Sequence, residues 1–274
     1  MSAGTVVGLL IAGLVVLQVG WPLWRRRRRT RWHAEGLDET QREVIERTIP
    51  LVAAMPQTYR KRFEGLVRQF IHEKDFVGCN GLVVEPEHRL IIAAQACLLL
   101  LNRPGGCYDD LQTILVYPDA FIVEHDELDA DGLVHAGRDL RTGESWDDGR
   151  VIVSWSDVIM GADNPDDAYN VVIHEFAHQL DGQSGLVNGA PSIVREELAA
   201  HWPERMRREF DALRGAVERG VHTFIDPYGA SSPAEFFAVL SEVFFEMPAQ
   251  LQRRHPVLYE CLDAVYDLDP ARWS

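Results

Sequence analysis

The hydrophobic pattern begins with 22 residues, 3–24, that contain no charged side chain. At about 1.5 Å per helical residue this run extends roughly 33 Å, which is enough to cross a bilayer once. A cleavable signal peptide carries its basic residues before the apolar run, whereas here five arginines, Arg25–Arg29, follow it. The pattern therefore predicts a retained transmembrane helix. Because basic residues that flank a span stay in the cytoplasm, we expect the following domain on the cytoplasmic face of the inner membrane.

Apolar residues recur at three- and four-residue spacing in two later parts of the chain, which is typical of amphipathic helices. In the first part, Phe63, Leu66, Val67 and Phe70 lie on one helical face, with charged residues between them. The ranges predicted as helices are 43–49, 59–72, 89–101, 167–181, 192–219, 233–246 and 248–263.

Between the two helical parts, short runs rich in β-branched and aromatic residues are separated by Asp, Gly and Pro. The predicted strands are 114–117, 121–123, 133–134 and 151–155. They indicate a small antiparallel or mixed sheet. No repeat, low-complexity linker or change of composition follows residue 33, so we expect a membrane and basic segment, 1–32, and one α+β domain, 33–274.

Charge excludes one class of partner. Six of the 27 basic residues lie within the first 32 positions, which leaves 21 basic against 42 acidic residues in the rest of the chain. Such an acidic domain repels a phosphate backbone, so no direct binding to nucleic acid is expected. We interpret the arginines as a topology signal that also attracts anionic lipid headgroups; a regulatory or nucleic-acid contact is the alternative. The four cysteines form no CxxC pair, as in a reduced cytosolic protein.

The strongest chemical signal is an HExxH motif formed by His174, Glu175 and His178. Four-residue spacing places both imidazoles on one helical face, where both can bind one zinc ion at about 2.0–2.1 Å. The adjacent Glu175 is placed to take a proton from a water that the metal activates. Apolar residues flank the motif on both sides, so the helix is expected to be buried.

A catalytic zinc ion needs a third protein ligand and an open position. The downstream candidates are His201, His222, Asp226, Glu235, Glu242 and Glu246. Glu235 follows Ser232 and Pro233 at a predicted helix start, so closing a capping box is an equally good role for it. Glu242 lies seven residues further along the same face and is an equal candidate from spacing alone.

Two further features leave their alternatives open. Asp181 is placed either to hydrogen-bond a ligand imidazole or to end the helix as a solvated carboxylate. The strand Val151–Trp155 leads toward the HExxH helix and is either a peptide-binding edge or an interior strand.

The chain resembles the zinc peptidase family of Mlc titration factor A over roughly residues 40–270. The segments that carry this resemblance are 115–157, 168–181 and 225–245, the last reading IDPYGASSPAEFFAVLSEVFF. The resemblance implies a zincin-like fold, Glu235 as the third zinc ligand and Tyr228 facing the site. It also implies a peptide or protein substrate, cleaved by peptidase or aminopeptidase activity, and a transcriptional regulator as a partner. The membrane segment and the arginines are not part of the family's usual cytosolic form.

These observations together predict a membrane-anchored zinc peptidase in which His174, His178 and Glu235 hold the metal. Glu175 acts as the general base, and Tyr228 donates a hydrogen bond to the oxyanion. The alternative is a binding module that keeps zinc without catalysis and sequesters a regulator. An intact Glu175 argues against it, because a site without catalysis needs no base.

Overall fold

The computed structural model describes residues 20–128, 134–141, 143–146, 149–164, 166–183 and 185–273. Most of the predicted membrane segment, residues 3–19, lies outside this part of the chain. Among the residues described, no helix combines the length and the apolar character that a membrane crossing requires.

Helices dominate the molecule. The α-helices are α2 (Trp21–Glu35), α3 (Glu39–Thr48), α4 (Pro50–Ala53), α5 (Gln57–Glu73), α6 (Pro86–Leu98), α7 (Trp155–Asp163), α8 (Val171–Gly182), α9 (Glu196–Ala199), α10 (Trp202–Glu218), α11 (Pro233–Glu246), α12 (Pro248–Arg254) and α13 (Pro256–Tyr266). The short 3-10 helices are η2 (Pro227–Ala230) and η3 (Pro270–Arg272). The strands are β1 (Asp75–Gly78), β2 (Thr113–Tyr117), β3 (Phe121–Leu128), β4 (Val134–Arg141), β5 (Gly143–Trp146) and β6 (Arg150–Ser154).

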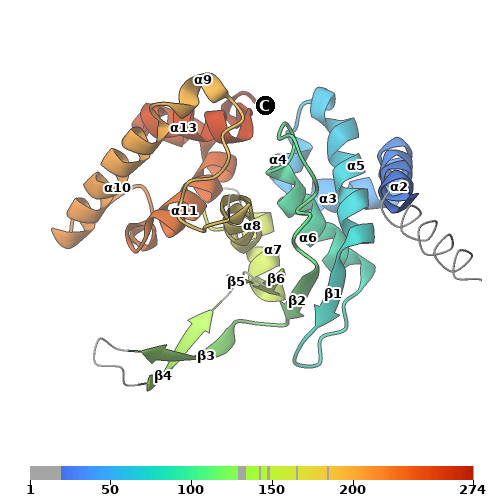
Figure 1. The fold of residues 1–274 in the computed structure, drawn as a ribbon, viewed down its shortest axis with the longest axis horizontal. Coiled ribbons are helices and arrows are strands. Elements are labelled where there is room, and N and C mark those ends of the chain that lie inside the picture. The colour runs from blue at the N-terminus through green and yellow to red at the C-terminus, as the bar shows by residue number, and fades with distance from the viewer. Residues whose placement is uncertain are drawn as a thin grey trace, which may run out of the picture.

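The main sheet has the strand order β1-β2-β6-β5 (Figure 1). Strands β1, β2 and β6 run parallel, and β5 pairs antiparallel with β6. Strands β3 and β4 form a separate antiparallel pair. The expectation of an α+β fold with a small mixed sheet is therefore confirmed. β6 lies between two other strands, so the interior interpretation of Val151–Trp155 is correct, and β1 and β5 form the two edges of the sheet.

The structure corrects three sequence expectations around this sheet. Strand β5 (Gly143–Trp146) was not predicted. Strand β1 was not predicted, since only Phe76 among its four residues is buried. The predicted strand 151–155 ends one residue early, because Ser154 caps a helix that begins at Trp155. The Ser154 side chain accepts a hydrogen bond from the Asp157 amide at 3.4 Å.

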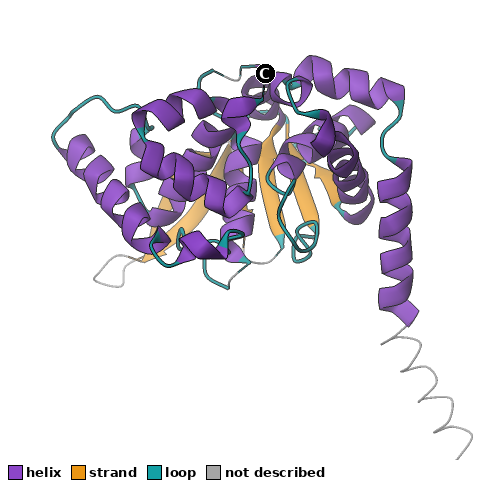
Figure 2. Ribbon diagram, turned by 90° about the horizontal axis from the view of Figure 1, so that it is seen from above, coloured by secondary structure: helices purple, strands orange, loops and turns teal. Residues whose placement is uncertain are grey.

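Helix α8 lies in the middle of the molecule, between the amino-terminal helices α5 and α6 and the carboxyl-terminal helices α10 to α13 (Figure 1). Figure 2 shows helices wrapped around the strands of the main sheet. Phe176 of α8 packs against Tyr108 and Phe70, with ring centroids 4.8 and 5.5 Å apart. The central helix is therefore anchored in the aromatic core.

Helix α2 packs along α5 and begins before the domain boundary expected after residue 32. Its Trp32 is buried and stacks on His72 with a centroid distance of 4.9 Å. His33 lies against Gly65 of α5, where an added Cβ would stand only 2.9 Å from the His33 Cα. The close approach of these two helices therefore requires glycine at this position.

We predict that Gly65→Ala destabilises the protein by about 1–2 kcal/mol, because the added methyl group meets the α2 backbone. Gly215→Ala in α10 is the matched control, since its Cβ would meet only the flexible end of Arg219, at 3.1 Å. The free energy of unfolding of this control should rise by up to about 1 kcal/mol, because alanine has a higher helix propensity than glycine. Thermal unfolding of the full chain in detergent measures both effects. Equal behaviour of the two variants would contradict this account of the α2–α5 contact.

Candidate metal centre

Helix α8 carries the HExxH motif and has a well-defined start. The side chain of Asn170 caps the helix by accepting a hydrogen bond from the Ile173 amide at 2.9 Å. His174 and His178 lie one turn apart on the same face, and their ring centroids are 4.9 Å apart. Both imidazoles are largely buried, as the apolar flanks of the motif predict.

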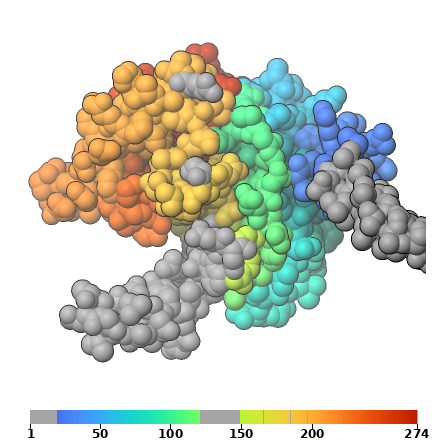
Figure 3. Space-filling view, viewed as in Figure 1, coloured from blue at the N-terminus to red at the C-terminus, as the bar shows by residue number. Residues whose placement is uncertain are grey.

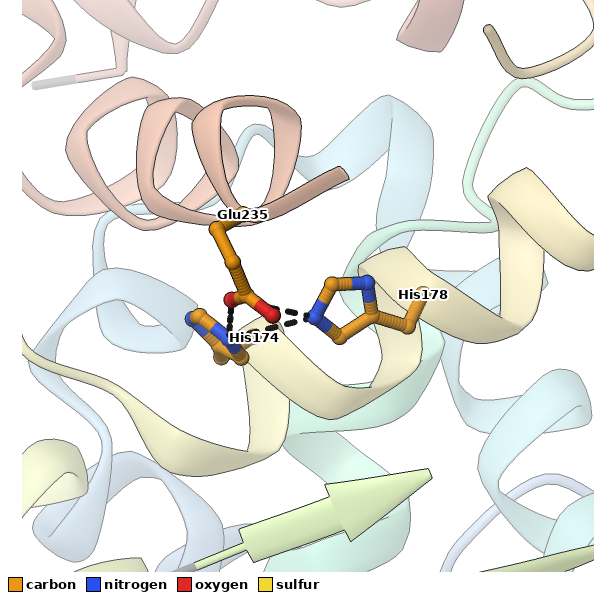
Figure 4. A group of neighbouring side chains, drawn as sticks. All are labelled: His174, His178 and Glu235. Atoms are coloured by element: carbon orange, nitrogen blue, oxygen red, sulfur yellow. Dashed lines mark hydrogen bonds and ion pairs between the residues drawn. The ribbon is translucent and has the colours of Figure 1, made fainter. Parts of the chain in front are cut away.

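Glu235 lies in the first turn of α11 and faces the two histidines (Figure 4). Its Oε2 lies 2.9 Å from Nε2 of His174 and 3.4 Å from Nε2 of His178. Ser232 accepts a hydrogen bond from the Glu235 amide at 3.1 Å, so half of the expected capping box is present. The Glu235 backbone thus takes part in the cap, while its carboxylate points into the site.

The three donor atoms have the spacing that a tetrahedral metal requires. The two Nε2 atoms lie 3.2 Å apart, which closes a triangle with sides of 2.9, 3.2 and 3.4 Å. A tetrahedral ion with ligands at about 2.0–2.1 Å separates those ligands by about 3.3 Å. Of the residues that the structure describes, only His174, His178 and Glu235 form such a group of potential ligands. This donor set fits zinc.

Glu242 of α11 lies on the other side of His174. Its Oε1 is 2.8 Å from Nδ1 of His174, and its Oε2 accepts a hydrogen bond from the Asn170 amide at 2.5 Å. A carboxylate at Nδ1 fixes the proton there and leaves the Nε2 lone pair for a metal. Spacing alone made Glu242 an equal ligand candidate, but its carboxylate orients a histidine instead of joining the group of three.

This arrangement needs a positive charge between Glu235 and His174. With its proton on Nδ1, His174 directs a lone pair at the Glu235 oxygen, and two acceptors at 2.9 Å repel each other unless a proton or a metal ion lies between them. Burial lowers the pKa of His174, but hydrogen bonds with Glu235 and Glu242 raise it well above its ordinary value. The same histidines hold the pKa of Glu235 below its ordinary value, although burial opposes this shift.

A third carboxyl group lies deeper along the same face of α11. Glu246 Oε1 accepts a hydrogen bond from the Asn170 side-chain amide at 2.9 Å. Burial raises the pKa of Glu246 to about 9, and the nearby charge of Glu242 adds to this shift. Glu246 is therefore a neutral acid at pH 7, which lets it lie close to the Glu242 carboxylate.

Glu175 and Tyr228 border the group of three. Glu175 is 5% exposed, and its charge contributes to the raised pKa of His174. Tyr228 lies in η2, where the Asp226 side chain accepts a hydrogen bond from the Tyr228 amide at 2.7 Å. Its ring centroid is 6.1 Å from that of His174, and the residue is 54% exposed. Tyr228 therefore faces both the metal ligands and the solvent.

Asp181 has neither of the two roles expected for it, a hydrogen bond to a ligand imidazole or a solvated carboxylate at the helix end. Its carboxylate is fully buried and accepts hydrogen bonds from the amides of Gly189 and Ala190 at 2.6 and 2.8 Å. It fixes the segment after α8, because a buried carboxylate requires donors close by. The Nδ1 atom of His178 has no hydrogen-bond partner among the described residues.

Comparisons with known proteins agree with this geometry. Residues 21–267 match a family described as "Glucose-regulated metallo-peptidase M90". An uncharacterized protein of Synechocystis sp., slr2042, is 38% identical over 272 residues, covering 98% of both chains. Mlc titration factor A of Pectobacterium atrosepticum is 35% identical and covers 81% of this chain and 84% of its own length. Its counterpart in Yersinia pestis is 34% identical, over 82% of this chain and 85% of its own length.

The raised pKa of Glu246 predicts a pH-dependent stability. Between its ordinary pKa of 4.5 and its folded value of about 9, the folded protein keeps a proton that the unfolded chain releases. The free energy of unfolding therefore falls as pH rises through this range, by up to about 1.4 kcal/mol per pH unit. Glu246→Gln keeps a neutral side chain at every pH, so it should lose less stability between pH 5 and pH 8 than the unchanged protein.

Denaturant unfolding at several pH values measures this slope. Glu218→Gln, at an exposed position in α10, serves as the control and should leave the slope unchanged. A Glu246→Gln variant with the same slope as the unchanged protein would mean that this carboxyl group is ionised in the fold.

Proposed function

The chain belongs to the family of glucose-regulated metallopeptidases M90, and on this basis we propose that it is a zinc-dependent peptidase. The observation that carries the proposal is the convergence of Nε2 of His174, Nε2 of His178 and Oε2 of Glu235 beside a buried Glu175. Two imidazoles and one carboxylate, with an open fourth position, are a ligand set of catalytic zinc.

Each residue has a distinct role in the proposed hydrolysis. Bound zinc would polarise the peptide carbonyl and make water more acidic. Glu175 would accept the proton of the attacking water and pass it to the leaving amine. Tyr228, placed at the solvent-facing border of the site, would donate a hydrogen bond to the oxyanion. Glu242 would hold the imidazole of His174 in the orientation and tautomer that metal binding requires.

The second candidate function is binding of a transcriptional regulator. The name of these relatives, Mlc titration factor A, favours it, because titration implies sequestering a partner. Both functions can coexist on one chain. They differ in what they require of Glu175, which is needed for hydrolysis and dispensable for sequestration.

We also propose that residues 3–24 anchor the domain on the cytoplasmic face of the inner membrane. Support comes from the uncharged run and from the arginines that follow it. The Synechocystis relative matches 98% of the chain, so its match includes most of this segment. A reporter fused after Ser274 should be cytoplasmic, and replacing Arg25–Arg29 with neutral residues should weaken that orientation. A reporter found outside the cytoplasm would refute the proposal.

Zinc content tests the ligand set. We expect the full chain in detergent to bind one zinc ion, and His174→Ala, His178→Ala and Glu235→Ala each to lose most of it, because each removes one of three ligands. Glu242→Ala should retain zinc with about 10- to 100-fold weaker affinity, since it removes only the partner of a ligand. Competition with a chelating dye measures these affinities. If zinc binding is lost in Glu242→Ala and kept in Glu235→Ala, then Glu242 is the third ligand and Glu235 is not.

Hydrolysis tests the catalytic roles. Glu175→Gln should keep zinc and the fold but lose peptide cleavage, because an amide cannot accept the proton of water. Tyr228→Phe should keep zinc and lower kcat about 100- to 1000-fold, the range for removal of one oxyanion donor. Cleavage of a fluorogenic peptide library by the zinc-loaded full chain provides the measurement. Undiminished cleavage by Glu175→Gln would place the base elsewhere.

A further inference from the structure

The segment that follows α8 lies against the start of α11, the helix that carries Glu235. Figure 3 shows this segment, residues 185–195, in yellow at the surface, between the green and the orange parts of the chain. Within residues 185–190, only Gly189 is buried. A Cβ added to it would stand 2.6 Å from the Pro233 carbonyl carbon and 3.2 Å from the Ala234 amide nitrogen. The backbone of the segment therefore touches the peptide group just ahead of Glu235.

We propose that Asp181 and Gly189 are positioning residues of the metal centre, which set the place of Glu235 relative to the two histidines. The proposal deepens the zinc-dependent function proposed above and rests on Glu235 as a ligand. Neither positioning residue belongs to the group of potential ligands. Each acts through the segment after α8 and the first turn of α11.

Asp181 ties this segment to the helix that carries both histidines. It lies in the last turn of α8, three residues after His178. Its fully buried carboxylate accepts hydrogen bonds from the amide of Gly189 at 2.6 Å and from that of Ala190 at 2.8 Å. Hydrogen bonds from amides to a carboxylate are charge-assisted and stronger than neutral ones. The end of α8 therefore fixes the position of Gly189.

Gly189 transmits this position to α11. Its φ of +77° lies in the left-handed region, which glycine adopts without steric cost. A side chain there would overlap the Pro233 carbonyl group, which belongs to the backbone of α11 and cannot rotate away. Glu235 lies in the same helical turn, with Oε2 2.9 Å from Nε2 of His174. A change at Gly189 therefore displaces the ligand.

The far end of the segment is held as well. Arg103 is buried and donates through Nη1 to the carbonyls of Ser192, at 2.9 Å, and Val265, at 2.5 Å. The amide of Arg195 donates to the carbonyl of Ala264 at 3.0 Å. The segment is thus fixed before and after its contact with α11. Such support holds a ligand set in its binding geometry before the metal arrives.

Zinc affinity of the full chain in detergent, measured by competition with a chelating dye, tests the proposal. Asp181→Asn keeps the size of the side chain but turns one acceptor toward the amides into a donor, so affinity should fall about tenfold. Gly189→Ala should cause a similar loss without any change of charge. Gly185→Ala is the matched control. Its φ is +97° in the same segment, but no described neighbour lies within 4 Å of the added Cβ, so it should bind zinc as tightly as the unchanged protein.

A double-mutant cycle shows whether the effect passes through Glu235. We expect that adding Asp181→Asn to Glu235→Ala leaves the residual affinity of the two imidazoles unchanged. Added to Glu242→Ala, which keeps the three ligands, the same substitution should still weaken binding about tenfold. A loss that persists in the Glu235→Ala background would be a direct effect of the Asp181 charge on the metal and overturns the proposal.

Circular dichroism without zinc identifies the variants that fold, and Asp181→Asn carries the test if Gly189→Ala does not fold. The proposal is also overturned if either variant folds and binds zinc as tightly as Gly185→Ala. The proposed function stands in that case, provided that Glu235→Ala loses zinc. A full chain that binds no zinc, or a Glu235→Ala variant that keeps it, refutes the ligand set itself and this proposal with it.

Discussion

The site depends on one histidine that is held by a carboxylate at each ring nitrogen. His174 meets Glu235 at Nε2 and Glu242 at Nδ1, with distances of 2.9 and 2.8 Å. Both carboxylates come from α11, separated by seven residues, or about two helical turns. A shift of α11 by a single turn along α8 would break both contacts together. The relative position of these two helices therefore fixes the chemistry of the centre.

Burying these polar groups is costly, and the hydrogen bonds of His174, Glu242 and Asn170 offset part of this cost. Asn170 is central to this pairing, because it caps α8, donates its amide to Glu242 and donates its side chain to Glu246. One residue thus links the start of the HExxH helix to two carboxyl groups of α11. Apolar packing of Phe176 against the aromatic core holds the opposite face of α8 in place.

The sequence predicts the long amphipathic helices and the placement of His174 and His178 on one helical face, because both depend on short-range spacing, whereas Glu235 was expected only from the family resemblance. The i and i+4 histidines and the long amphipathic helices need no knowledge of distant contacts. The function of Glu242 could not be predicted, since a ligand and its hydrogen-bond partner look alike until α8 and α11 are placed together. Strand β1 escaped prediction for a similar reason, because four residues with one buried side chain become a strand only by pairing with β2. The packing of α2 on α5 was also missed, since its arginine-rich sequence resembles a solvated segment.

The contact between α2 and α5 has a mechanical consequence. A domain joined to a bilayer by a flexible linker samples many heights and orientations. Here the joining segment is α2, a helix of 15 residues, about 22 Å long, whose second half packs on α5. The guanidinium carbon of Arg28 lies 4.5 Å from the ring centroid of Trp24 and 4.7 Å from that of Trp32. These contacts stiffen the middle of α2. With the proposed anchor in the membrane, the candidate metal centre would lie at a set height, and a peptidase acting there would cleave only substrates whose cleavage sites reach that height above the lipid surface.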